Sequence, residues 1–218
     1  MKNELLKRIL SSVILLPVVI FIIIEGSLLF NFFIIICFLI TLYEWHMMSK
    51  KKPYYLLGFI FLILSFYTIH KLIDFGDSYI IFLFITLICV FTDLGGYIFG
   101  KIFKGPKLTK LSPKKTYAGM IGGFLLPIIF TNFFFNITHL FKNKLEISLN
   151  LLIFIILVSL VSQLGDIFIS YFKRLSKIKD TGKLIPGHGG ILDRIDGMIF
   201  SFPFSYLILS SNILNIFK

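Results

Sequence analysis

The chain has 218 residues, of which 57% are hydrophobic and 15% are charged, and its net charge at neutral pH is +11. This composition is far more apolar than that of a soluble domain and indicates an integral membrane protein. The positive charge by itself would also suit a nucleic-acid-binding protein, but the basic residues alternate with apolar runs in the way that orients membrane helices. Nucleic acid is therefore not expected as a partner.

Seven apolar runs follow one another along the chain, and each is expected to form a membrane helix. They cover residues 9–24, 28–43, 54–69, 79–99, 117–137, 149–172 and 197–217. We predict an all-α, polytopic integral membrane bundle of about seven helices, although the first three runs are short of the roughly 20 residues that cross a bilayer. The first run resembles a signal peptide but lacks a cleavage motif, so we expect a permanent helix. G-x-x-x-G spacings begin at Gly96 and Gly119 and are typical of closely packed membrane helices.

The distribution of basic residues predicts the orientation of the chain. Eighteen of the 22 Lys and Arg residues lie at the N-terminus and in alternate connections, and only Lys71, Lys142, Lys144 and Lys218 lie on the other side. The positive-inside rule then places the N-terminus in the cytoplasm. We expect one membrane domain, with scaffold helices in residues 1–75 and catalytic helices in residues 79–218. The cytoplasmic loops 100–116 and 173–196 carry six basic residues each.

Four aspartates are the candidate metal ligands. Asp93 lies eight residues before Lys101, and Asp166 lies seven before Lys173, so both sit roughly 10 to 12 Å inside the cytoplasmic boundary. Carboxylates at this depth usually face a bundle interior or a wet cavity. Asp193 and Asp196, three residues apart at the start of the last helix, share nearly one face with each other. Four oxygen-donor side chains at one level favour a hard cation such as Mg²⁺, which shares its coordination shell with substrate phosphate.

Two segments are candidate phosphate-binding sites. Gly187, Gly189 and Gly190 surround His188 just before a helix N-terminus, where backbone N–H groups can approach an anion. Ser112, Lys114, Lys115 and Thr116 stand before another helix, where hydroxyl and ammonium groups can bind phosphate. Purely structural explanations of these residues also remain open. They are a glycine-rich turn, a capping histidine, an ordinary helix start at Asp193, and lysines that only obey the positive-inside rule.

The segment "SYFKRLSKIKDTGKLIPGHGGILDRID", Ser170 to Asp196, resembles the signature of the phosphatidate cytidylyltransferase (CDP-diacylglycerol synthase) family. That pattern runs S-x-hydrophobic-K-R, K-D, P-x-H-G-G and D-R-hydrophobic-D, and every fixed position is present. A second block, "TDLGGYIFGKIFKGPKLTKLSPKKTYAGMIGG", is similar to the family's D-x-x-A-Y-x-x-G-K and S-P-x-K-T-x-x-G-x-x-G-G elements, with Gly96 where alanine is usual. The family is commonly longer, with eight or nine membrane helices.

The resemblance implies a reaction, in which CTP and phosphatidic acid give CDP-diacylglycerol and pyrophosphate with Mg²⁺ and a second metal such as K⁺. It implies metal binding by Asp166 and Asp193, with Asp196 and Asp93 as neighbours. The catalytic residues expected from the signature are Lys173, Arg174, Lys179, Asp180, His188 and Arg194. Lys173, Arg174, Lys179 and Arg194 are expected to neutralise the triphosphate and the leaving pyrophosphate. The expected location is a bacterial inner membrane, with the site on the cytoplasmic side and membrane lipids around it.

Two other functions stay open at this point. A CTP-dependent lipid kinase of the polyprenol or phytol type would share the nucleotide and the membrane, but it would release CDP. An ion-coupled transporter would use intramembrane carboxylates such as Asp93 and Asp166, although the outer halves of these helices are almost wholly apolar. The D-G-x-x-A-R pattern of CDP-alcohol phosphotransferases is missing. The sequence leaves open whether the chain forms a homodimer.

Overall fold

A computed structural model describes residues 17–19, 21–23, 25–75, 79–109, 112, 115–137, 148–184, 189–211 and 213–214. These residues form helices and loops, without a strand in the described part of the chain, which confirms the predicted all-α class. The helices are α2 (Ser27–Ser49), α3 (Tyr55–Phe75), α4 (Tyr79–Phe103), α5 (Tyr117–Ile137), α6 (Leu149–Leu175), α7 (Leu192–Ile195) and α8 (Met198–Ser210).

Six of the seven predicted membrane helices coincide with described helices. By length and composition, four are able to cross a membrane: Leu28–Ser49, Tyr55–Asp74, Tyr79–Phe103 and Leu149–Leu175. The apolar helices in α5 and α8 are shorter. The first predicted run, residues 9–24, lies mostly outside the described residues.

The last predicted helix differs from expectation. The apolar run continues to residue 217, but α8 ends at Ser210 and has 13 residues. At 1.5 Å per residue this is about 20 Å, which is less than the thickness of the hydrocarbon core. Asp196 and Gly197, between α7 and α8, keep right-handed helical dihedral angles, so the two helices form one nearly continuous segment.

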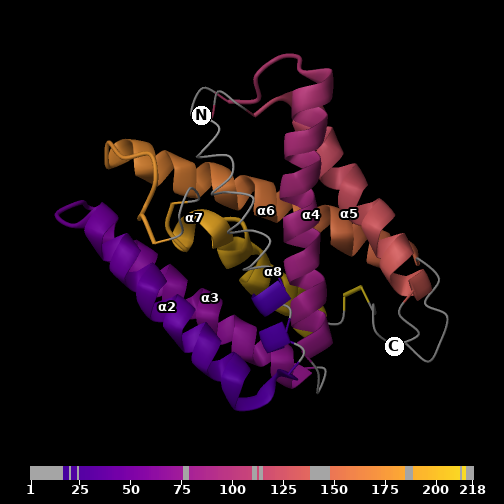
Figure 1. Cartoon of the computed structure of the whole chain (residues 1–218), viewed down its shortest axis with the longest axis horizontal. Helices are drawn as coiled ribbons and strands as arrows, with labels where there is room; N and C mark the ends of the chain where they lie inside the picture. The colour runs from indigo at the N-terminus through magenta and orange to yellow at the C-terminus, as the bar shows by residue number, and fades with distance from the viewer. Residues whose placement is uncertain are drawn as a thin grey trace.

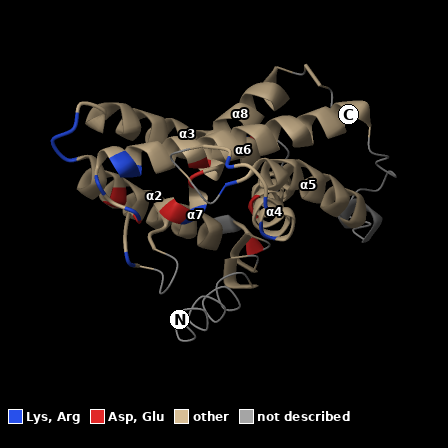
Figure 2. Ribbon diagram, turned by 90° about the horizontal axis from the view of Figure 1, so that it is seen from above, with Lys and Arg blue, Asp and Glu red and all other residues tan. Residues whose placement is uncertain are grey.

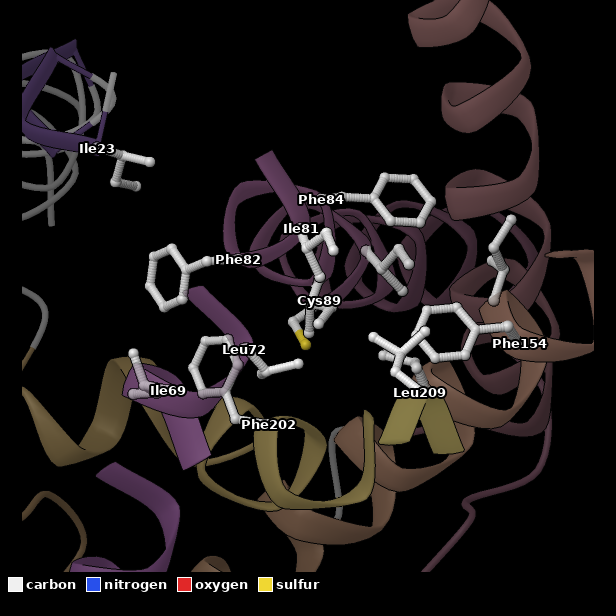
Figure 3. Close-up of a cluster of buried hydrophobic side chains, with 14 of the residues drawn as sticks. Ile23, Ile69, Leu72, Ile81, Phe82, Phe84, Cys89, Phe154, Phe202 and Leu209 are labelled. Atoms are coloured by element: carbon white, nitrogen blue, oxygen red, sulfur yellow. The ribbon is translucent and has the colours of Figure 1, made fainter. Parts of the chain in front are cut away.

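Helix α8 lies in the middle of the bundle (Figure 1), where it packs against α3, α4 and α6. Apolar side chains from these four helices meet in one cluster, including Leu72, Ile85, Phe154 and Phe202. Figure 3 shows members of this cluster pointing into a shared interior. The rings of Phe82 and Phe202 stack with centroids 5.0 Å apart. Burial of these side chains holds the last helix in place.

Helices α4 and α5 pack more closely than any other pair in the described chain. A Cβ atom on Gly95 would meet the carbonyl of Gly122, and one on Gly119 would meet the carbonyl of Gly96. Gly100 lies beside Gly119 in the same interface. The expectation that the G-x-x-x-G glycines allow close helix packing is confirmed.

The outer faces of α2 and α3 carry large apolar side chains that no other part of the described protein covers. More than half of the side-chain surface is exposed at Leu28, Phe32, Leu39, Leu56 and Ile60. An exposed apolar surface of this extent is expected for helices that contact lipid. Together with the long apolar helices, it identifies an integral membrane protein.

Candidate active site

The C-terminal half of α6 carries a polar stripe. Asp166, Ser170 and Lys173 are four and three residues apart, so they share one face of the helix. The Ser170 hydroxyl donates to Asp166 Oδ1 at 3.3 Å. Asp166 pairs with Lys115 from the loop after α4, and Lys173 pairs with Asp193 of α7. The stripe therefore joins the two loops in which the sequence predicted the site.

Lys115 reaches Asp166 from the residue pair that comes just before α5. The Lys115 ammonium forms an ion pair with Asp166 Oδ2, and both side chains are partly buried. Thr116 accepts a hydrogen bond from the Gly119 N–H at 3.1 Å, so it caps the N-terminus of α5. The Leu108 N–H donates to the Lys115 carbonyl at 2.8 Å and closes the loop. This arrangement fixes the backbone from which Lys115 extends.

Lys173 lies between the two aspartates of the last signature element. Its Nζ is 2.9 Å from Asp193 Oδ1 and 3.9 Å from Asp196 Oδ2. Lys173 is only 8% exposed, so its ammonium is compensated by these carboxylates and not by water. The expectation that Asp193 and Asp196 lie on one side of a helical segment is confirmed by this shared partner.

Both oxygens of Asp193 are fully engaged within the protein. Oδ1 accepts from Lys173, and Oδ2 accepts from the Thr181 N–H at 2.7 Å, the Gly190 N–H at 3.0 Å and the Thr181 hydroxyl at 3.1 Å. Burial alone would raise the pKa of Asp193, but the hydrogen bonds from Lys173, Gly190 and Thr181 hold this pKa below its ordinary value. As an anion, Asp193 therefore connects Thr181 and Gly190 of the signature segment to Lys173 of α6.

Asp196 and Asp93 complete the acidic group. Burial, followed by repulsion from the Asp166 carboxylate, raises the pKa of Asp196 well above its ordinary value, and Asp93 contributes in the same direction. Asp93 lies on an exposed position of α4 and interacts electrostatically with Asp166, Lys115 and Arg194. Figure 2 shows acidic and basic positions interspersed around α7 and beside α4. The structure thus brings the four predicted aspartates into one electrostatic neighbourhood.

The two described glycines of the G-H-G-G turn have a steric role. Gly189 has a φ of +90°, a conformation that side chains disfavour, and a Cβ atom there would lie 2.7 Å from Asp193 Oδ2. A Cβ atom on Gly190 would overlap the carboxylate of Glu44. The N–H of Gly190 already donates to Asp193. In this structure the glycines allow two carboxylates to approach the backbone.

Glu44 of α2 belongs to this group, and the sequence analysis missed it. It is 4% exposed, and its carboxylate accepts from the Ile191 N–H at 3.0 Å, the Leu192 N–H at 2.8 Å and the Thr181 hydroxyl at 2.9 Å. A usable signal was present, because Glu44 lies six residues before Lys50. The same spacing argument identified Asp93 and Asp166, but Glu44 was assigned to the end of a scaffold helix.

The remaining predicted residues take several positions. Arg174, Lys179, Asp180 and Arg194 are exposed, and Arg174 donates to the Ile178 carbonyl at 3.0 Å. The Ser112 N–H donates to Thr109 Oγ1 at 3.1 Å within its loop. Lys114, Gly187 and His188 lie outside the described residues. The roles of all these side chains stay predictions.

A preformed metal centre is not found in the described part of the chain, where no three His, Cys, Asp or Glu side chains converge closely enough to hold an ion. Asp166 and Asp193 instead contact ammonium groups. This geometry is compatible with Mg²⁺, which is usually held by one or two carboxylates together with substrate phosphates. Burial and the neighbouring Asp166 carboxylate raise the pKa of Asp196, and a divalent cation bound beside it would favour the ionised form. The donor set fits a hard cation that arrives with a phosphate ligand.

Taken together, the fold and the site define a class of protein: a polytopic membrane protein with a charged site at one end of its apolar bundle. Carboxylates that suit a hard cation lie beside exposed cations that suit a polyphosphate. Three connections meet at the C-terminal end of α6: Tyr54 of the α2–α3 turn hydrogen-bonds Ser176, Lys115 before α5 pairs with Asp166, and Asp193 of α7 pairs with Lys173.

Comparison with known proteins identifies the family. Residues 53–212 match the model of the Cytidylyltransferase family. The chain is 36% identical to the phosphatidate cytidylyltransferase of Rickettsia felis over 95% of its own length and 93% of the relative's. It is 36% identical to that of Rickettsia conorii, over 92% and 89% of the two chains, and 40% identical to that of Staphylococcus haemolyticus, over 62% and 50%. The chain belongs to the cytidylyltransferase family.

Proposed function

We propose that this protein transfers the cytidylyl group of CTP to phosphatidic acid, giving CDP-diacylglycerol and pyrophosphate. The observation that carries the proposal is the match along nearly the whole chain to relatives named for this activity. The charged cluster at the end of an apolar bundle agrees with it, because one substrate is a lipid anion and the other a soluble polyanion. The lipid kinase and transporter alternatives gain no support from these relatives.

The chemistry requires alignment and charge neutralisation more than proton transfer. An oxygen of the lipid phosphate, already an anion at neutral pH, attacks the α-phosphorus of CTP, and the bond from that phosphorus to the pyrophosphate oxygen breaks. Arg174, Lys179 and Arg194 are exposed cations that suit the triphosphate and the departing pyrophosphate. We assign the buried Lys173 to a different task, because it already compensates Asp193 and Asp196.

Magnesium is part of this proposal. Asp166, Asp93 and Asp196 are the carboxylates whose mutual repulsion an ion would relieve, and Asp193 is the fourth predicted ligand. The bound ion would supply positive charge that offsets the charge of the phosphates and makes phosphorus more electrophilic. The Lys115 ammonium pairs with Asp166, so we expect Lys115 to hold this carboxylate in position. A second ion such as K⁺ stays a prediction.

The proposed location is the inner membrane of a bacterium, with the site and the N-terminus on the cytoplasmic side. The relatives above are bacterial proteins, and the basic residues lie where the positive-inside rule requires for this orientation. CTP then reaches the site from the cytosol, while the acyl chains of phosphatidic acid remain in the bilayer. A homodimer stays an open expectation.

A single labelling experiment tests the function. The purified protein is incubated with phosphatidic acid, Mg²⁺ and CTP labelled at its α-phosphate. The proposal predicts that the label enters the lipid fraction and that unlabelled pyrophosphate is released in equal amount. A lipid kinase would transfer the γ-phosphate and leave the label in CDP. Label that stays in unreacted CTP under these conditions would contradict the proposed activity.

A further inference from the structure

The strongest feature outside the predicted site is the carboxylate of Glu44 on α2. It lies in residues 1–75, the part of the chain expected to be scaffold, yet it accepts two backbone hydrogen bonds from the start of α7, at Ile191 and Leu192. These N–H groups belong to the first turn of a helix, where they have no partner within the helix itself. Glu44 therefore caps α7 from a distant helix.

The Thr181 hydroxyl connects Glu44 to Asp193. Its Oγ1 lies 2.9 Å from Glu44 Oε2 and 3.1 Å from Asp193 Oδ2. A hydroxyl has one proton to donate, so it serves one of the two carboxylates at a time. The Thr181 N–H, by contrast, donates to Asp193 alone at 2.7 Å. Any displacement of Glu44 is thus transmitted to the loop that positions Asp193.

The end of α2 is anchored firmly enough to act as a fixed support. Trp45, next to Glu44, is 2% exposed, and its indole N–H donates to the Tyr55 carbonyl at 3.0 Å. The Ser176 hydroxyl, just after α6, donates to the Met48 carbonyl at 2.8 Å. Tyr54 in the α2–α3 turn hydrogen-bonds the same Ser176 hydroxyl at 2.8 Å. These hydrogen bonds hold the C-terminal ends of α2 and α6 together, close to the residues that Glu44 contacts.

Gly182 and Gly190 both lie directly against the Glu44 carboxylate. A Cβ atom on Gly182 would lie 2.6 Å from Glu44 Oε1, and one on Gly190 would overlap the same carboxylate. The described loop thus closes around Glu44 from two sides. A side chain that the protein encloses in this way is held in one position.

We propose that Glu44 is a positioning residue of the active site, which fixes the start of α7 and, through Thr181, the orientation of Asp193. This inference rests on the proposed cytidylyltransferase function for its kinetic consequence. In this proposal Glu44 does not contact the reacting atoms. It acts through the loop, so the N-terminal helices contribute directly to the geometry of the site.

Glutamine is the informative substitution, because both oxygens of Glu44 accept from N–H groups. In Glu44→Gln an amide NH₂ replaces one oxygen and faces a backbone donor, so one of the bonds to Ile191 or Leu192 is lost. Aspartate keeps both oxygens but withdraws them by about 1.5 Å. Glu25→Gln is the matched control, since Glu25 is an exposed carboxylate just before the same helix.

The test combines hydrogen exchange with steady-state kinetics on the full-length protein in detergent. In Glu44→Gln we expect faster amide exchange at residues 189–197 and a kcat at least about tenfold lower. The KM for CTP should stay within about twofold, because the exposed cations assigned to the triphosphate are untouched. Glu44→Asp should recover part of kcat, and Glu25→Gln should match the wild type in both measurements.

Wild-type exchange at residues 189–197, or a wild-type kcat, in Glu44→Gln would overturn the proposal. If Glu44→Gln does not fold, Thr181→Val decides, because it keeps Glu44 and removes only the shared hydroxyl. A lower kcat in folded Thr181→Val supports the connection, and a full kcat refutes it. If the wild type forms no CDP-diacylglycerol, the proposed function fails, while the exchange comparison still reports whether Glu44 holds the loop.

Discussion

The ammonium of Lys173 lies 2.9 Å from the carboxylate of Asp193, and both side chains are buried where α6 meets α7. The two residues are 20 positions apart in the chain, and the signature loop closes between them. The same ammonium is 3.9 Å from Asp196. Lys173 is therefore the cation that allows two acidic residues of the signature to lie inside the protein.

Replacing Lys173 by methionine should destabilise the protein strongly. The substitution keeps most of the side-chain volume but leaves Asp193 and Asp196 buried without their cation, which typically costs about 3 to 5 kcal/mol. Arg174→Met is the matched control, because Arg174 is exposed and its loss should cost less than about 1 kcal/mol. Thermal unfolding in detergent measures both. Equal melting temperatures for the two variants would show that Lys173 does not compensate the aspartates.

Removing Lys115 should weaken turnover without abolishing it. Lys115→Ala frees Asp166 from its ion pair and leaves that carboxylate without a fixed orientation. We expect a kcat/KM for CTP lower by about tenfold, with Lys115→Arg retaining more activity than Lys115→Ala. Lys107→Ala, an exposed lysine in the same loop, should leave the rate unchanged. An unchanged rate at limiting CTP in Lys115→Ala would reduce Lys115 to a determinant of membrane orientation.

Gly189 and Gly105 provide a matched pair of glycines. Their φ values are +90° and +99°, so alanine is strained at either position by about 1 to 2 kcal/mol. A Cβ atom at position 105 meets nothing within 4 Å, whereas one at position 189 meets Asp193. Gly189→Ala should therefore lower activity by much more than Gly105→Ala, measured as CDP-diacylglycerol formed per unit of folded protein. Similar losses in both variants would leave only backbone strain as the explanation.

Much of this organisation was predictable from local sequence. Apolar runs gave the positions of six described helices, and the distances of Asp93 and Asp166 from the next lysine placed them at one depth. Carboxylates at the same depth that all face the interior of one helical bundle are expected to lie near one another, so their proximity was predictable. Contacts between segments that are far apart in the sequence were not predictable in this way.

The features that escaped prediction depend on tertiary contacts. Lys173 was expected to face phosphate, because no local pattern tells a buried lysine from an exposed one; the structure pairs it with Asp193. Gly190 was expected to face an anionic ligand, and its N–H instead donates to Asp193 beside the carboxylate of Glu44. Glu44 itself meets α7 across 147 positions of sequence. Such a pairing leaves no periodic signal.

Acid should destabilise the folded protein through Asp193. Hydrogen bonds hold the folded-state pKa of Asp193 below its ordinary value, which is about 3.9 in an unfolded chain. The anion therefore stabilises the fold above pH 4, and this contribution is lost as the pH falls through the folded-state pKa. Melting temperatures between pH 6 and pH 3 should fall less steeply in Asp193→Asn than in the wild type. Parallel curves would contradict this account of Asp193.

The most direct test of the central claim is the rate of CDP-diacylglycerol formation by Asp166→Asn, measured across a Mg²⁺ titration beside Asp74→Asn. Both variants exchange one carboxylate for an amide, but Asp74 is an exposed residue near the end of α3, paired with Lys71. We predict that folded Asp166→Asn loses at least about 100-fold in rate at every Mg²⁺ concentration, while Asp74→Asn matches the wild type. An Asp166→Asn protein that retains the wild-type rate and Mg²⁺ dependence would contradict the assignment of this carboxylate group as the active site.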